Sequence, residues 1–188
     1  MAEAATAPEA ALDDATLAGR ARDGDIRAYE QLVLRYQGRM FRLASRMLAD
    51  RAEAEDVVQE VFLTAWRRIG QLQDNGAFGG WLYRMTTNRC LNVLRSRPIH
   101  ADVDPDTTES PQRTTQPEHA AQVHGQLAAL TAALQRLTPE QRACWLLREV
   151  HGQSYEEIAD IVGANTTAVR GRIARARVQL AEVMQPWR

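Results

Sequence analysis

The chain has 188 residues, of which 45% are hydrophobic and 25% charged, and its formal net charge is −1. This composition is typical of a globular protein and argues against a disordered chain, and no stretch approaches the roughly 18 apolar residues of a membrane helix. The first residues lack the basic start and apolar run of a signal peptide, so we expect a cytoplasmic protein without membrane insertion.

The charges are distributed unevenly along the chain. Residues 17–97 hold 14 arginines against nine acids and residues 120–188 hold eight against six, whereas residues 1–16 and 98–119 are acidic. Two basic blocks separated by an acidic stretch predict two surfaces for a polyanion. We therefore expect a disordered tail at 1–16, two domains at 17–97 and 120–188, and a flexible, proline-rich linker at 98–119.

Three helices are predicted in the first domain. Apolar residues recur at helical spacing over 26–47, after a start signal at Asp25. A second helix follows Asp50, which resembles the first residue of a capping box, and its apolar face extends to residue 69. The glycine-containing segment 73–80 interrupts the pattern, and a third helix is expected over 81–95.

The second domain is also predicted to be helical. An apolar stripe covers 123–137, and Thr138 followed by Pro139 marks the start of another helix. That helix is expected to bury Ala143, Leu146, Leu147 and Val150. Since no strand pattern occurs, the predicted fold class is all-α: two small helical bundles joined by a flexible linker.

The end of the second bundle has the pattern of a helix-turn-helix. Ser154 and Glu157 form a capping box for a short helix that Gly163 ends, and Asn165 or Thr166 caps a longer basic helix. Arginine donates two parallel hydrogen bonds to phosphate or guanine, so the exposed face of this helix is predicted to bind duplex DNA. The residues are Thr167, Arg170, Gly171, Arg172 and Arg175. The alternative is an ordinary helical hairpin with a solvated face.

A second candidate surface combines the third helix with the loop before it. Aromatic, amide and arginine side chains beside such a loop are suited to holding unstacked bases. The candidates are Asp74, Asn75, Trp81, Arg84, Asn88, Asn92 and Arg95. For Trp81, a simple core position is the alternative.

A third candidate surface lies on the second helix, where Asp56, Gln59 and Glu60 fall away from the apolar face. Negative charge near a helix N-terminus is favoured by the helix dipole and repels DNA. The patch therefore predicts a protein partner, unless it is merely solvated.

Three segments carry a resemblance to a known family: "DRAEAEDVVQEVFLTAWRRI", "WLYRMTTNRCLNVLR" and "LTPEQRACWLLREVHGQSYEEIADIVG". In this order and around a proline-rich linker, the chain resembles the extracytoplasmic-function sigma factors of bacterial RNA polymerase, over about 17–97 and 121–183. The resemblance implies a monomer when free, which binds core RNA polymerase and directs initiation at specific promoters. It also raises an anti-sigma factor as a candidate partner.

The resemblance assigns a role to each surface. Asp56, Gln59 and Glu60 are expected to contact the clamp helices of the largest subunit, and the second domain to contact the flap of the second-largest subunit. The third-helix surface is expected to open the −10 element, and the last helix to read the −35 element. Asn92 stands where the family often has an acid, and the last helix differs from the usual family sequence, so no promoter sequence is assigned.

No catalytic residue, metal site or cofactor is predicted, because the sequence lacks a nucleophile–base pair, a metal-ligand spacing and a phosphate-binding glycine loop. Polymerase is expected to perform the chemistry. Cys90 and Cys144 are expected in the core, and His151 is expected to face solvent, as are His100, His119 and His124.

Two other functions remain open on the residues alone. One is a dimeric repressor or activator that binds DNA tightly by itself, and the other is a helical adaptor without a DNA role. The small net positive charge of each domain predicts weak duplex binding by the free chain, because phosphate neutralisation supplies most non-specific affinity.

Overall fold

The computed structural model describes residues 12–97 and 129–184, and these ranges contain helices and no strands. The first half consists of α1 (Asp14–Arg22), α2 (Ile26–Leu48), α3 (Arg51–Arg68), η2 (Ile69–Gln71), η3 (Asn75–Ala77) and α4 (Phe78–Ser96). The second half has helical residues at 129–135, then α6 (Pro139–Glu149), α7 (Tyr155–Val162) and α8 (Thr166–Met184). The predicted all-α fold is confirmed. None of the helices in these ranges has the length and hydropathy needed to span a bilayer.

The predicted helix caps are present. Asp50 accepts a hydrogen bond from the backbone N–H three residues later at 2.9 Å. Thr138 and Ser154 each form a complete capping box. Asn165 caps α8, since its Oδ1 accepts from the Ala168 N–H at 2.8 Å. Gly163 ends α7 in the left-handed conformation with φ 63°, which an L side chain rarely adopts.

Helix α1 was not predicted, and it begins inside the segment 1–16 that was expected to be a disordered tail. Asp13 caps the helix, and the Asp14 carboxylate accepts hydrogen bonds from Arg35 at 2.7 Å and Tyr36 at 2.6 Å. Those contacts span more than 20 residues and leave no local signal in the sequence. Residues 1–11 and the predicted linker 98–119 lie outside the described residues.

Helix α4 begins at Phe78, three residues before its predicted start, because Gly79 acts as a packing residue. A Cβ atom at Gly79 would lie 2.6 Å from the Tyr36 hydroxyl, so only glycine lets α4 approach α2 this closely. Phe78 is fully buried and its ring meets Tyr36 edge-on at 5.7 Å. Two of the glycines that were expected to break the chain, Gly79 and Gly80, therefore lie in the first turn of the helix.

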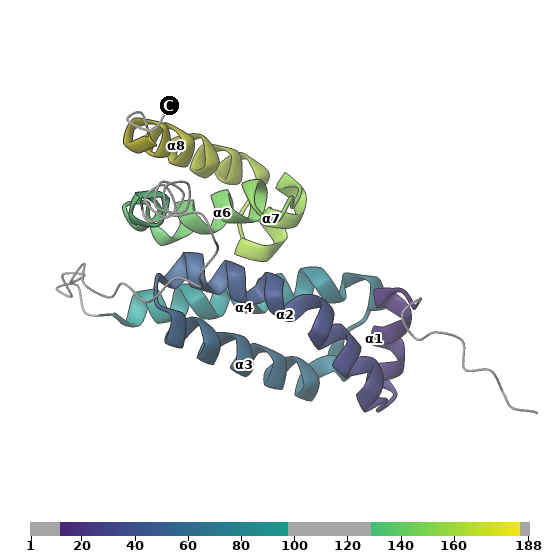
Figure 1. The fold of residues 1–188 in the computed structure, drawn as a ribbon. Helices are drawn as coiled ribbons and strands as arrows, with labels where there is room; N and C mark the ends of the chain where they lie inside the picture. The colour runs from purple at the N-terminus through teal and green to yellow at the C-terminus, as the bar shows by residue number, and fades with distance from the viewer. Residues whose placement is uncertain (1–11, 98–128, 185–188) are drawn as a thin grey trace, which may run out of the picture.

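The two halves pack directly against each other. Figure 1 shows α6 and α7 lying along α2 and α4, with α3 on the opposite side of the first half and α8 on the far side of the second. Buried apolar residues form one cluster that extends through both halves, and it includes Cys90 and Cys144 as predicted. Val150 is an error of the sequence analysis, since it is 38% exposed where α6 has ended.

Two leucines of α2 provide a matched test of this core. Leu32 is fully buried, whereas Leu34 is 69% exposed. We expect Leu32→Ala to lower the free energy of unfolding by about 2–5 kcal/mol, because it removes buried methyl groups and leaves a cavity. Leu34→Ala should change it by about 0.5 kcal/mol or less. Urea denaturation followed by circular dichroism measures both, and equal effects would contradict the packing described.

Candidate nucleic-acid interface

The surface of α8 presents most of its predicted DNA-binding residues to solvent. Thr167, Arg170 and Arg175 are exposed, while Gly171 and Arg172 are partly buried. The Arg170 guanidinium lies 5.2 Å from the centre of the Tyr155 ring, which holds it at the edge of α7. Arg172 is directed partly inward, towards the buried Cys144. Burial raises the pKa of the Cys144 thiol, and Arg172 lowers it by a smaller amount.

The predicted stripe on α4 is continuous and exposed. Arg84, Asn88, Asn92 and Arg95 are all accessible, and they follow one another along the helix. Trp81 begins the stripe and is half-buried, with its ring 6.2 Å from Phe78, so it is part of the core edge as well as of the surface. Its predicted role in base stacking stays a prediction.

The loop before α4 is held in shape by its own side chains. Asp74 accepts a hydrogen bond from the Gly76 N–H at 2.9 Å and caps the turn η3. The Asn75 Oδ1 is buried and has no hydrogen-bond partner. A buried carbonyl oxygen without a partner is costly, and the amide nitrogen of the same side chain faces Gly19 of α1, so Asn75 packs inward.

This loop borders a cleft between the two halves, with a volume of about 580 Å³. Trp81 and Arg84 line one side, and Glu157, Asp160 and Ile161 of α7 line the other. The cleft therefore brings part of the predicted base-binding surface face to face with two acids of the second half.

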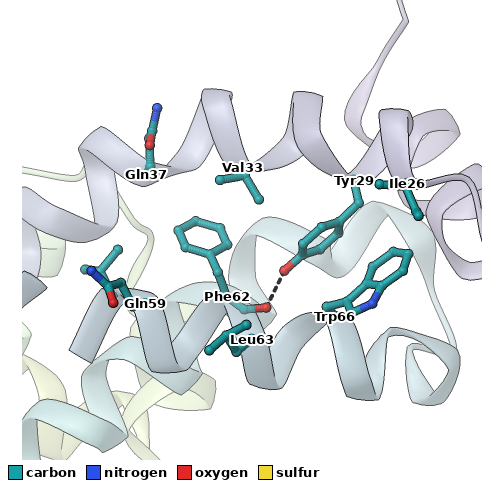
Figure 2. A pocket seen from close by; sticks show the side chains of 9 residues that line it. Ile26, Tyr29, Val33, Gln37, Gln59, Phe62, Leu63 and Trp66 are labelled. Atoms are coloured by element: carbon teal, nitrogen blue, oxygen red, sulfur yellow. Dashed lines mark hydrogen bonds between the residues drawn. The ribbon is translucent and has the colours of Figure 1, made fainter. Parts of the chain in front are cut away.

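The third predicted surface adjoins an apolar groove between α2 and α3. Asp56 and Gln59 are exposed, whereas Glu60 forms an ion pair with Arg89 of α4 at 2.7 Å. The groove has a volume of about 540 Å³, and Figure 2 shows its side chains converging from the two helices. It is lined by Ile26, Tyr29, Val33, Gln37, Val58, Gln59, Phe62, Leu63 and Trp66.

Two large apolar side chains are open to water at this groove. Ile26 is 61% exposed and Leu63 58%. The floor is firm, because the Tyr29 hydroxyl donates to the Phe62 carbonyl at 2.6 Å and its ring lies 4.9 Å from Trp66 (Figure 2). An exposed apolar groove on a fixed floor is typical of a surface that binds another protein.

Arg142 joins the two halves, and sequence reasoning missed it. Its side chain is 3% exposed. The guanidinium donates to the Met47 carbonyl at the end of α2 and to the Leu134, Gln135 and Leu137 carbonyls. Burial lowers the pKa of Arg142 to about 10, with a further contribution from Arg97, so the group stays charged at neutral pH. Its position in a predicted apolar helix gave no sign of this role.

His151 lies at the same interface, so its predicted solvent-facing position was wrong. Its Nδ1 is 3.1 Å from the Tyr83 hydroxyl of α4, and the two rings meet edge-on at 5.3 Å. Its Nε2 is buried without a partner. The contact spans 68 residues of sequence, and only the packing of the two halves creates it. His100, His119 and His124 lie outside the described residues, which contain no group of three potential metal ligands.

Comparisons with known proteins identify both halves. The model of Sigma-70 region 2 matches residues 32–98, and that of Sigma-70, region 4, matches residues 127–180. The RNA polymerase sigma-H factor of Pseudomonas aeruginosa is 35% identical over 182 residues, which cover 92% of this chain and 94% of the relative. The chain belongs to the sigma-70 family. The ECF RNA polymerase sigma-E factor of Escherichia coli K12 is 34% identical over 93% of the chain and 96% of its own length, which indicates the extracytoplasmic-function group.

The protein is therefore an alternative sigma factor, a DNA-binding transcription factor that directs promoter-specific transcription. This decides against the repressor and the adaptor. Two solved structures share the fold. The first is CnrH in complex with the cytosolic domain of CnrY, with 26% identity and a TM-score of 0.71 over 92% of this chain and 97% of the other. The second is Bartonella quintana RpoE in complex with the anti-sigma factor NepR, with 25% identity and a TM-score of 0.66 over 84% and 96%.

The environment of His151 predicts acid sensitivity. Burial lowers the pKa of His151 to about 4, and the positive charges of Arg46, Arg42 and Arg39 on α2 add to the effect. In the unfolded chain the pKa of histidine is about 6.5. Between pH 6.5 and pH 4 the unfolded chain therefore binds a proton that the folded protein does not bind, so the free energy of unfolding is highest above pH 6.5 and decreases as the pH falls towards 4. The melting temperature should therefore drop between pH 7.5 and pH 5.

The variant His151→Gln isolates this contribution, because glutamine keeps a polar group beside Tyr83 but does not titrate. Differential scanning calorimetry should show a smaller loss of melting temperature for the variant than for the wild-type protein over the same pH interval. Parallel losses in the two proteins would contradict the buried neutral state of His151.

Proposed function

We propose that this sigma factor uses its three surfaces at three separate contacts of the initiation complex. Region 2 binds the clamp helices of the largest polymerase subunit through α3, and its α4 surface opens the −10 element. Region 4 binds the flap of the second-largest subunit, and α8 reads the −35 element in the major groove. The observation that carries the proposal is that one chain of the sigma-70 family holds all three exposed surfaces on separate helices.

The clamp contact is supported by the chemistry of α3. Gln59 lines the apolar groove, and Asp56 lies about one turn before it on α3. A partner helix that places apolar side chains in the groove can therefore also pair its basic side chains with Asp56. Burying Ile26 and Leu63 favours the contact, because removing apolar surface from water contributes about 25 cal/mol per Å² before the costs of association are subtracted. Glu60 is held by Arg89, so its share in the contact requires that ion pair to open or to be shared.

The −10 contact is supported by the α4 stripe and its loop. Arg84 and Arg95 provide charge for the phosphates, while Asn88 and Asn92 offer amides to base edges. The Asn75 Oδ1 is buried, so it can accept a hydrogen bond from a base only after the loop has moved. Binding of an unpaired base offsets its unstacking cost of a few kcal/mol, so opening requires no catalytic residue in this chain and polymerase performs the chemistry.

The −35 contact is supported by the helix-turn-helix formed by α7 and α8. Thr167, Arg170 and Arg175 lie exposed near the N-terminal half of α8, where a recognition helix meets base edges. Arg170 and Arg175 are the residues on which we expect most of the specific affinity to depend, because each can donate two parallel bonds to guanine. Arg172 is left with a smaller role by its inward direction.

An anti-sigma factor is a further proposed partner. RpoE of Bartonella quintana, to which this chain is similar, forms a complex with the anti-sigma factor NepR. The groove between α2 and α3 suits a helix of such a protein, which would then compete with polymerase for the same apolar surface.

Run-off transcription with core polymerase tests the −35 contact. The templates are DNA fragments that core polymerase transcribes only when the wild-type chain is added. The double variant Arg170→Ala and Arg175→Ala should reduce the RNA product at least about tenfold, because each bidentate contact contributes about 1–3 kcal/mol. Arg136→Ala is the matched control, since Arg136 is exposed beside the far end of α8. Equal activity of the double variant and the control would overturn the −35 assignment.

Binding to core polymerase tests the clamp contact separately. The charge reversal Asp56→Arg should weaken co-elution with core polymerase and raise the dissociation constant by about tenfold, since reversing a charge beside a complementary surface costs more than 1 kcal/mol. Glu182→Arg makes the same charge change at an exposed site on the last helix and should leave the constant unchanged. Similar dissociation constants for the two reversals would place the core contact elsewhere.

A further inference from the structure

Helix α2 carries a row of arginines, three of which lack an acidic partner. Residues 31–48 contain Arg35, Arg39, Arg42 and Arg46 and no aspartate or glutamate. Arg35 pairs with Asp14 of α1 at 2.7 Å. Arg39, Arg42 and Arg46, which we call the α2 arginine cluster, form no ion pair with any acid in 12–97 and 129–184. The cluster therefore holds positive charge that the described part of the chain does not neutralise.

The helix alone does not account for this cluster. Arg39 and Arg42 are three residues apart and Arg42 and Arg46 four, so the three side chains share one face over about 10 Å of helix axis. Like charges at these spacings repel one another and weaken a helix. The helix dipole favours a cation in the last turn, which explains Arg46, but Arg39 and Arg42 precede that turn. These two arginines therefore cost the helix stability unless an anion binds beside them.

One end of the cluster reaches the interface between the two halves. The Arg46 carbonyl accepts a hydrogen bond from Gln135 at 3.4 Å. The Arg46 Nη1 is buried without a hydrogen-bond partner, and so is the His151 Nε2. The guanidinium of Arg142, at the same interface, instead donates to four carbonyls. A buried N–H group without an acceptor is costly, so Arg46 differs from Arg142 in having donor capacity that the protein does not use.

The other end of the cluster is open to solvent. Arg39 and Arg42 are exposed, and Arg46 is partly exposed. The Arg39 guanidinium lies 5.7 Å from the centre of the Tyr36 ring. A Cβ atom at Gly38 would lie 3.4 Å from an Nη atom of Arg42, so this guanidinium lies back along α2. An anion can therefore reach Arg39 and Arg42 directly, whereas contact with the Arg46 Nη1 requires that side chain to turn outward.

The cluster also acts on the contact between the two halves. Burial lowers the pKa of His151 most, and the charges of Arg46, Arg42 and Arg39 lower it further. Burial raises the pKa of Tyr83, and Arg39 and Arg42 lower it by a smaller amount. The three guanidinium groups are thus near the pair formed by Tyr83 and His151, and their positive fields add there.

We propose that the α2 arginine cluster binds an anion that carries at least two phosphate groups. The planar fork of arginine donates paired hydrogen bonds to phosphate oxygens, and three forks over about 10 Å exceed what one phosphate can accept. Each phosphate brings more negative charge and more acceptors than a carboxylate, so it neutralises the cluster more completely. This site is separate from the surfaces of α3, α4 and α8, so it does not depend on their proposed roles.

The test is isothermal titration calorimetry of the full-length chain with sodium pyrophosphate at neutral pH, in about 0.1 M sodium chloride to screen non-specific attraction. We expect the wild-type chain to bind with a dissociation constant of about 1 mM or lower. The variant Arg39→Gln with Arg42→Gln changes two exposed side chains. It should raise the dissociation constant at least about tenfold, because it removes two sets of charge-assisted hydrogen bonds.

The matched control carries Arg67→Gln and Arg68→Gln, two exposed arginines at the end of α3. It makes the same change in net charge, and its dissociation constant should stay within about twofold of wild type. A third protein, Arg39→Lys with Arg42→Lys, keeps the charge and loses the paired hydrogen bonds, so we expect binding about threefold weaker than wild type. The lysine pair also provides a result that does not depend on the stability of the glutamine pair.

A second titration distinguishes a free phosphate compound from the backbone of a nucleic acid. The same proteins are titrated against a fluorescein-labelled single strand of about 12 nucleotides, with fluorescence anisotropy as the signal. If the glutamine pair weakens binding of pyrophosphate alone, the ligand is a free phosphate compound. If it weakens binding of the strand as well, and the control does not, the ligand is a nucleic-acid backbone. Both results support the phosphate site.

Three results would overturn the proposal. The first is that neither pyrophosphate nor the strand binds to the wild-type chain, in which case the cluster is only solvated. The second is equal weakening by the glutamine pair and by the control, which indicates general attraction to a less acidic surface. The third is equal affinity of the wild-type chain for sodium sulfate and sodium pyrophosphate, because an anion with a single centre then suffices and the binding is adventitious.

Discussion

A single buried guanidinium constrains how the two halves of this sigma factor sit together. Arg142 is charged and almost fully buried, yet none of the carboxylates in 12–97 and 129–184 pairs with it; the Met47 carbonyl near the end of α2 and the Leu134, Gln135 and Leu137 carbonyls accept its hydrogen bonds instead. Carbonyls at helix ends carry partial negative charge and lack partners within the helix, so they satisfy a cation that would be costly to bury otherwise. Separating the halves must move or hydrate this group, and the interface therefore has a specific geometry.

In this arrangement of the two halves, the three functional surfaces differ in how exposed they are. The groove between α2 and α3 and the exposed face of α8 both remain accessible, whereas the cleft at the start of α4 faces the acids of α7. If the surfaces act as we propose, the closed chain can meet core polymerase first and expose its strand-opening surface only after region 4 has moved. Such an order keeps a free sigma factor from occupying single-stranded DNA, and its modest net charge acts in the same direction.

Local sequence signals predicted the helices well and their packing poorly. Asp50, Thr138, Ser154 and Gly163 act on neighbouring backbone atoms, so their roles could be read from spacing alone. Gly79 was expected to break the chain. The residue that requires a glycine there is Tyr36, which lies 43 positions earlier in the sequence. Arg142 and His151 were missed for the same cause, since each has a partner in the other half, Met47 and Tyr83 respectively. The three surfaces were found because their residues repeat along single helices, although their roles are still predictions that rest on family resemblance.

The central claim is that the halves are closed in the free protein and separate on the promoter, and a distance measurement tests it most directly. Arg67→Cys on α3 and Ala174→Cys on α8 introduce exposed thiols for spin labels, while Cys90 and Cys144 are buried and their raised pKa keeps them unreactive. Double electron–electron resonance should give one narrow distance for the free chain, and a clearly longer distance in the complex with core polymerase and promoter DNA, where the two DNA elements lie more than one duplex turn of about 35 Å apart. A broad distribution in the free chain, or an unchanged distance in the complex, would contradict the account.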